Sequence, residues 1–119
     1  MKTFNYESKC VKYNDCFFDR GEYDNGNLEL SIYGRIENDI NTSHISNPTI
    51  NVKEKLKGTE IVIDTEVNTN LISFLMDLGI AKGIKRRIVS NGMQFPVVEL
   101  DLSKLDEYSY EQEVLRYAS

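Results

Sequence analysis

The chain has 119 residues, of which 40% are hydrophobic and 10% aromatic, a composition sufficient for one ordinary hydrophobic core. Its 19 acidic and 14 basic residues give a net charge of −5, which argues against nucleic-acid binding driven by electrostatics alone. Because no run of about 18 apolar residues occurs and the N-terminus lacks the apolar stretch of a secretion signal, we expect a cytoplasmic protein with no membrane association.

The two cysteines, Cys10 and Cys16, are too few for a disulfide scaffold. We interpret Tyr13–Asp15, which lies between them, as a turn. A two-residue loop at Asn14-Asp15 would not bring the two thiols face to face, so no disulfide is expected. The sequence therefore predicts two free thiols, buried or half-buried.

The first hairpin is indicated by the pair Asn25-Gly26, a strong turn signal because turns of this kind need positive φ. Apolar and polar residues alternate over residues 28–33, which predicts a strand buried on one face. Residues 16–23 supply its partner strand. Gly21 and the poor alternation of that segment predict a bulge there.

The middle of the chain contains two further strand candidates, Thr49–Val52 and Glu60–Asp64, joined by Lys53–Thr59. The preceding segment, Glu37–Pro48, is polar, and we expect a long loop.

The main helix is predicted from about Thr69 to Leu78, where apolar residues follow the spacing of one buried helix face. Asn68 or Thr69 can cap its start, and Gly79 can adopt the left-handed conformation that ends it. The residues of the apolar face are Leu71, Phe74, Leu75 and Leu78.

A second hairpin is indicated by Asn91-Gly92, which would pair Lys85–Ser90 with Met93–Leu100. Pro96 lies inside the second of these strands and has no N–H group to donate. It therefore predicts an edge position or a bulge.

A short C-terminal helix is predicted after Ser109, because Ser109 to Gln112 has the form of a capping box. The order of elements indicates an α+β fold over a single domain, residues 1–119. We expect an antiparallel sheet of about five to six strands, with the main helix packed on it.

Catalytic and metal-binding motifs are absent from the sequence, so we expect no enzyme, metal or cofactor. There is one histidine, His44, in a polar segment, and no clustered Cys or His ligands. The glycines do not have the spacing of a phosphate-binding loop. Asp64 and Glu66 are the remaining catalytic hypothesis, and the alternative is that they favour the start of the main helix.

Two charged segments are candidates for partner binding. The basic run (Lys82, Lys85, Arg86, Arg87) could contact phosphates, although consecutive residues of a strand point to opposite faces. The C-terminal part is acidic and rich in tyrosine, which is typical of protein interfaces, but the tyrosines could equally dock on their own sheet. Its candidate residues are Glu99, Asp101, Asp106, Glu107, Tyr108, Tyr110, Glu111 and Glu113.

About two-thirds of the chain resembles a family of short uncharacterised proteins carried by conjugative transposons and phages of low-GC bacteria. The family usually has a Gly-Glu-Pro-Tyr-like segment before its Thr-x-Asn-x strand, whereas this chain has His44–Pro48 at that place. The segments that carry the resemblance are Tyr23–Leu28, Thr49–Val52, Ile63–Thr65, Phe74-Leu75, Leu78–Ala81 and Ser90–Leu100.

The resemblance implies a mobile-element setting. Our hypothesis is a phage or mobile-element protein that inhibits a bacterial defence complex, of the CRISPR-nuclease inhibitor type, with an acidic surface that mimics nucleic acid. The alternative is an accessory factor for element maintenance or transfer that binds nucleic acid through the basic run. An exposed edge strand would also allow a homodimer.

Overall fold

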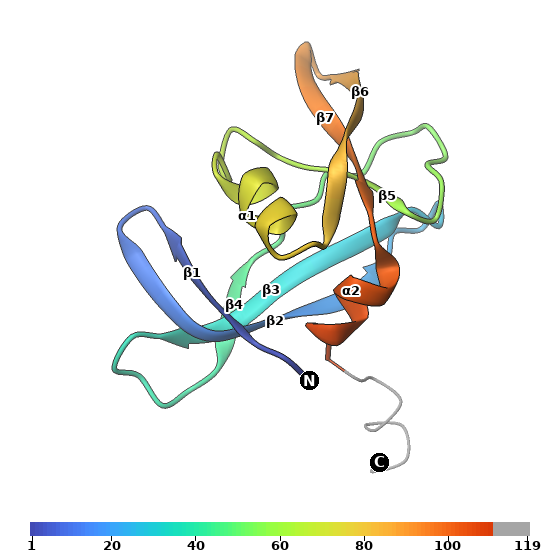
Figure 1. The fold of residues 1–119 in the computed structure, drawn as a ribbon. Helices are drawn as coiled ribbons and strands as arrows, with labels where there is room; N and C mark the ends of the chain where they lie inside the picture. The colour runs from blue at the N-terminus through green and yellow to red at the C-terminus, as the bar shows by residue number, and fades with distance from the viewer. Residues whose placement is uncertain (111–119) are drawn as a thin grey trace.

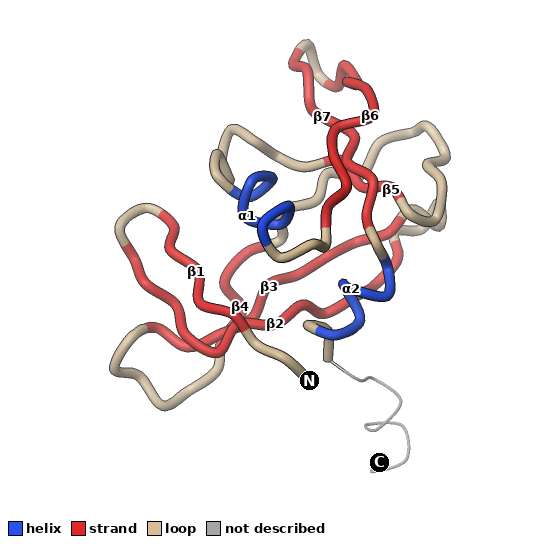
Figure 2. The backbone as a smooth tube through the Cα atoms, viewed as in Figure 1, coloured by secondary structure: helices blue, strands red, loops and turns tan. Residues whose placement is uncertain are grey.

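Two antiparallel sheets and two short helices make up residues 1–110, the part of the chain that the computed structural model describes (Figures 1 and 2). The elements are β1 (Phe4–Ser8), β2 (Val11–Glu22), β3 (Leu28–Ile36), β4 (Ser43–Ser46), β5 (Glu60–Val62), α1 (Leu71–Asp77), β6 (Ala81–Ser90), β7 (Met93–Leu100) and α2 (Leu102–Glu107). The first sheet has the strand order β1-β2-β3-β4 and the second the order β5-β7-β6.

The α+β class and the antiparallel pairing agree with the sequence, but one sheet of five to six strands was the wrong expectation. Each predicted hairpin forms a sheet of its own: β1 and β4 flank β2–β3, whereas β5 pairs with β7. None of the helices in the described part of the chain is long and apolar enough to cross a membrane.

The turns of the two predicted hairpins differ in length. At the second, Asn91 and Gly92 both have positive φ, and the register places Ile88 opposite Phe95, as the two-residue turn predicts. At the first, Gly26 alone has positive φ, and Tyr23 and Asn27 are joined by a backbone hydrogen bond of 2.9 Å. The first connection is therefore a three-residue loop.

Strand β2 departs from the sequence interpretation in two places. The bulge lies between Asn14 and Phe17, where Asp15 has a φ of 53°, and Gly21 pairs regularly with Glu29. Tyr13–Asp15 is consequently part of a strand and not a turn. The chain turns instead before β2, between β1 and β2, and that turn leaves Cys10 exposed while Cys16 is buried; both thiols are free.

The segment Thr49–Val52 is not a strand. It makes one isolated bridge, Thr49 to Ile63. From Val52 onward the backbone is held by hydrogen bonds to the side chain of Asn27. This buried amide donates to the carbonyls of Val52 and Glu54 and accepts from the N–H of Leu56. Hydrogen bonds to one side chain thus take the place of the backbone hydrogen bonds that a neighbouring strand would make. Conversely, the predicted loop Glu37–Pro48 contains β4.

Pro96 lies in β7, the central strand of the second sheet, and not at an edge. The position is tolerated because Val97 is the last residue of β7 that pairs with β5, so Pro96 stands one residue beyond that ladder. A register shift does occur nearby, in β6 between Ile84 and Arg86.

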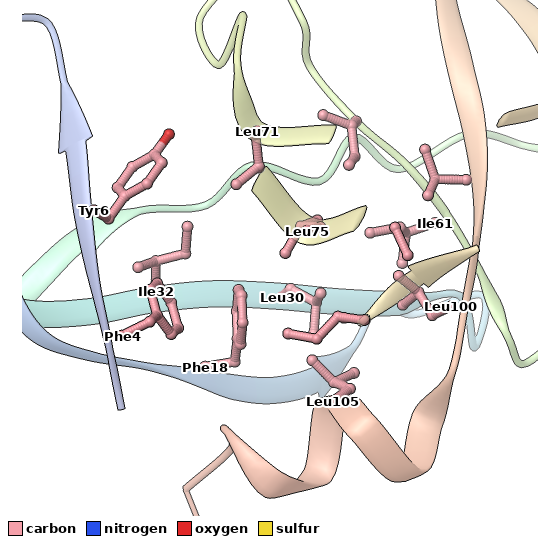
Figure 3. Close-up of a cluster of buried hydrophobic side chains, with 14 of the residues drawn as sticks. Phe4, Tyr6, Phe18, Leu30, Ile32, Ile61, Leu71, Leu75, Leu100 and Leu105 are labelled. Carbon is pink, nitrogen blue, oxygen red and sulfur yellow. The ribbon is translucent and has the colours of Figure 1, made fainter. Parts of the chain in front are cut away.

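The main hydrophobic core fills the space between the two sheets and is closed by α1 and α2 (Figure 3). Leu71 and Leu75 of α1 are buried in it, and Leu105 of α2 reaches it from the other end. A second cluster lies on the other face of the second sheet. There Val52 and Leu56 cover β5 and β7.

Helix α1 is shorter than predicted: its last residue is Asp77 and its C-cap is Leu78. Gly79 follows the cap with a φ of 77°, the left-handed conformation that was predicted for it. The N-cap of α1 is Asn70, which makes no capping hydrogen bond through its side chain. Asn68 is buried instead, and its amide donates to the carbonyl of Asp64 at 3.0 Å. Asn68 therefore fixes the connection before α1.

Helix α2 was not expected from the sequence. Asp101 caps it, since its carboxylate accepts the N–H groups of Ser103 and Lys104. Ser109, the predicted cap of a C-terminal helix, bridges Phe18 of β2 in parallel and donates its hydroxyl to the carbonyl of Leu105. The rest of that predicted helix lies outside the described residues.

Candidate interaction surfaces

The acidic residues at the end of β7 and in α2 have partners within the chain. Glu99 pairs with Lys85 at 2.8 Å, and this contact lowers the pKa of the Glu99 carboxyl. The hydroxyl of Ser103 and the backbone N–H groups at the start of α2 lower the pKa of Asp101. Both acids therefore serve local structure.

The two acids of α2 fasten the helix to the rest of the fold. Asp106 forms an ion pair with Arg20 of β2. Glu107 pairs with Lys2 at 2.6 Å and with Lys104 at 3.4 Å, and the hydrogen bond from Lys2 lowers the pKa of the Glu107 carboxyl. Glu111 and Glu113, the remaining predicted acids, lie outside the described residues.

The two tyrosines of this segment have different surroundings. Tyr108 is partly buried, with its ring edge-on to Phe4 at a centroid distance of 6.0 Å, and its carbonyl accepts the N–H of Phe18. Tyr110 is 38% exposed and lies 5.9 Å from the ring of Phe17. Tyr108 is thus docked on its own sheet, whereas Tyr110 remains accessible.

The basic residues of β6 do not form one patch. Lys85 is paired with Glu99, and Arg86 contacts both Glu54 and Glu60. Arg86 lies opposite Val97 and Arg87 opposite Pro96, so the two guanidinium groups leave the strand on opposite faces. Lys82 lies at the start of the same strand and is exposed.

Asp64 and Glu66 are joined by a local hydrogen bond, in which the N–H of Glu66 donates to the Asp64 carboxylate at 3.1 Å. This is the geometry of an Asx-turn. Within the described residues, His, Cys, Asp and Glu side chains form no group of three that could hold a metal ion.

A row of four aromatic rings crosses the outer face of the first sheet, and sequence reasoning did not find it. In order across the sheet the rings belong to Tyr110, Phe17, Tyr33 and His44. The rings of Phe17 and Tyr33 are stacked at 5.8 Å with an interplanar angle of 13°, and His44 meets Tyr33 edge-on at 5.2 Å. We refer to these four residues as the aromatic row.

The backbone register explains why the rings meet. Phe17 pairs with Tyr33 across β2 and β3, and Tyr33 pairs with His44 across β3 and β4. Neighbouring positions on the strands point into the core, for example Phe18 and Ile32. The sequence carried one signal for this row: in the alternating strand, Tyr33 occupies a position that faces away from the core.

Carboxylates flank the aromatic row. Side chains of a strand alternate between the two faces of the sheet, so residues an even number of positions apart share a face. Asp19 lies two residues after Phe17 in β2, and Glu29 lies four residues before Tyr33 in β3, so both share the face of the aromatic row. On the other side of the row, Asp15 forms an ion pair with Arg35. Among the described residues, this face therefore combines aromatic rings with carboxylates.

Comparison of the chain with protein-family models, with curated proteins and with solved structures found no match. The family resemblance thus stays a prediction from the sequence.

Proposed function

We propose that this chain is a protein-binding factor of a phage or mobile element, and that it inhibits a bacterial defence complex of the CRISPR-nuclease type. The contact surface that we propose is the aromatic row with its flanking carboxylates. The observation that carries this proposal is the continuous row of exposed and half-exposed rings on one sheet face, since aromatic residues are enriched among the hot spots of protein interfaces.

The charge of this face favours a basic protein over a nucleic acid. Rings on a sheet can stack on bases, but nucleic-acid platforms combine them with cations that neutralise phosphates. Here the Glu29 carboxylate shares the face, and Arg35 is already paired with Asp15. Arginine side chains of a partner would stack on the rings and be attracted to the Glu29 carboxylate, whose hydrogen-bond donor is the neutral amide of Asn47.

This surface replaces the acidic segment as the centre of the proposed interface. In the described part of the segment, Glu99, Asp106 and Glu107 are neutralised by cations of the chain itself. A nucleic-acid mimic needs carboxylates that are available to the partner.

A plasmid-interference assay tests the function. The full chain is expressed in a host with an active CRISPR nuclease, and we expect it to restore transformation by a targeted plasmid. Phe17→Thr and Tyr33→Thr should abolish this effect, because threonine keeps the strand but removes the ring. Val89→Thr is the matched control, since it removes an exposed apolar side chain from the other sheet.

Affinity capture of the tagged chain from the same host, with and without nuclease treatment, distinguishes the alternatives. A component of the defence complex that survives nuclease and is lost with Tyr33→Thr supports the proposal. Recovery that vanishes after nuclease favours the accessory nucleic-acid-binding factor. Full activity of both ring variants would contradict the aromatic row as the interface.

A further inference from the structure

A cleft lies between the β1–β2 turn and the segment that leads into α1, on the face of the first sheet opposite the aromatic row. Its larger hollow has a volume of about 270 Å³ and a smaller one of about 80 Å³ adjoins it. Both hollows are lined by Tyr6, Ser8, Lys9, Val67 and Asn68, so they form one continuous depression.

The lining of the larger hollow is amphipathic. Its apolar part consists of the rings of Tyr6 and Tyr13 together with Val11, Ile45 and Val67. Val67 is 48% exposed, so its side chain contributes accessible apolar surface to this lining. An apolar ligand body would cover this surface and remove it from water.

Several hydroxyl groups line the same hollow, among them those of Tyr6 and Ser8. The hydroxyl of Tyr6 points away from β1 toward the side of the core on which Leu71 lies (Figure 3). Burial raises the pKa of the Tyr6 hydroxyl, and the neighbouring side chain of Ser8 lowers it in part. The Ser46 hydroxyl also lines the hollow, but it donates its proton to the amide oxygen of the buried Asn68, so toward a ligand it can only accept.

The larger hollow differs in charge from the smaller one, because Glu7 lines only the smaller. Among the described residues that line the larger hollow, Lys9 alone carries a charged side chain at neutral pH. Lys9 and Cys10 have φ values of 51° and 65°, a left-handed pair that makes the β1–β2 turn tight and holds Lys9 at the rim. An anionic group of a ligand would form charge-assisted hydrogen bonds with this ammonium.

We propose that the cleft binds a small organic acid, in which a carboxylate pairs with Lys9 and the donors beside it while an apolar body covers Val11 and Val67. The volume is at the lower end of the range of about 300–1,000 Å³ typical of small-molecule sites, which favours a compact ligand. This proposal does not depend on the proposed function, because the aromatic row lies on the opposite face of the sheet.

Octanoate is the probe, with octanol as its uncharged counterpart. We expect a titration of the full-length, ¹⁵N-labelled chain with octanoate to give saturable shifts of the amide signals of Ser8, Lys9 and Val67. Octanol should bind at least about tenfold more weakly, because it cannot form the charge-assisted hydrogen bonds. The amides of Phe17 and Tyr33 serve as the internal reference.

The variants are chosen to keep the turn intact. Lys9→Asn removes the ammonium but suits a left-handed turn position, so the fold should hold while octanoate affinity falls by about tenfold. Cys10→Gly relaxes the neighbouring left-handed residue and leaves Lys9 in place, so affinity should not change. Val67→Glu should abolish binding by opposing the carboxylate.

Three results would overturn the proposal. The first is the absence of saturable shifts at the cleft amides with millimolar octanoate. The second is equal affinity for octanoate and octanol, which would remove the role of Lys9. The third is unchanged octanoate affinity of a folded Lys9→Asn variant, as judged from its amide spectrum.

Discussion

The backbone of Gly34 in β3 lies directly against the thiol of Cys16 in β2. A Cβ atom placed on Gly34 would stand 2.6 Å from the Cys16 Sγ and 2.9 Å from the Ile45 Cδ1, closer than real Cβ atoms approach other atoms. Gly34 and Cys16 are both buried in the first sheet. The glycine is therefore required by packing, not by a special backbone conformation.

Gly34→Ala should lower the free energy of unfolding by about 1–3 kcal/mol, the usual cost of forcing an extra group into a packed core. Equilibrium urea unfolding measures this change. Gly58→Ala is the matched control and should be close to neutral, because nothing lies within 4 Å of a Cβ at Gly58. Adding Cys16→Ala to Gly34→Ala should recover part of the loss; strictly additive effects would contradict the steric argument.

The buried thiol of Cys16 makes stability depend on pH at the alkaline end. Burial raises the pKa of Cys16 from 9.0 to about 11, so the folded chain holds this proton more tightly than the unfolded chain. The unfolded state then binds fewer protons between about pH 9 and 11, and the free energy of unfolding falls as pH rises through that window.

Cys16→Ala should flatten this decline, as judged from urea unfolding at pH 8 and above. Tyr6 contributes a decline of the same sign, since its pKa is also raised, so the decline should not vanish completely. Alkylation provides a second measurement: the exposed Cys10 should react rapidly and Cys16 only upon unfolding. Rapid modification of both thiols in the folded chain would refute the assignment.

The second hairpin was predictable from sequence because its signals are local. Asn91 and Gly92 have the conformation that their turn requires, and this turn fixes the register of β6 on β7. The end of α1 at Gly79 follows from the same kind of local signal. These elements needed no information about distant parts of the chain.

The errors arise where distant residues decide the conformation. Thr49–Val52 reads as a strand, but the buried amide of Asn27 holds the chain after it in a different path. Likewise, whether one sheet or two forms depends on the pairing of β5 with β7, which the alternation of residues does not encode. The aromatic row was missed because His44 lies in β4, which was expected to be part of a loop, and because the three-residue turn sets the register that places Phe17 opposite Tyr33.

Helix α2 provides a test at acidic pH. Glu107 has a lowered pKa in the folded chain, chiefly through the hydrogen bond from Lys2, so its contribution to stability is present above about pH 4.5 and is lost as pH falls. Glu107→Gln should therefore lower the melting temperature at pH 7 and leave a smaller further decrease between pH 5 and 3. Circular dichroism melts at these pH values measure both effects.

The control for this prediction is Glu66→Gln, which removes an exposed carboxylate outside the ion pairs of the described residues. It should leave the melting temperature at pH 7 nearly unchanged.

Asp101→Asn should lower the melting temperature only slightly, since asparagine caps helices well, whereas Asp101→Ala should lower it clearly. Equal effects of the asparagine and alanine variants at Asp101 would show that its capping role is negligible.

Arg86 and Arg87 are adjacent in β6 but should have very different effects when replaced. The Glu60 side chain is 5% exposed and lies 3.6 Å from the Arg86 guanidinium, while its other oxygen accepts the N–H of Lys57 at 3.1 Å. Arg86→Met would strand this carboxylate in a buried position and should cost about 1–2 kcal/mol, less than a completely buried pair because Arg86 itself is 40% exposed. Arg87→Met should change the free energy of unfolding by less than about 0.5 kcal/mol.

Urea unfolding compares the two, and the double variant Glu60→Met/Arg86→Met should recover much of the loss, because no charge is then left unpaired. Equal stability of the two single variants would free Arg86 from a structural role and would strengthen the alternative that β6 contacts nucleic acid.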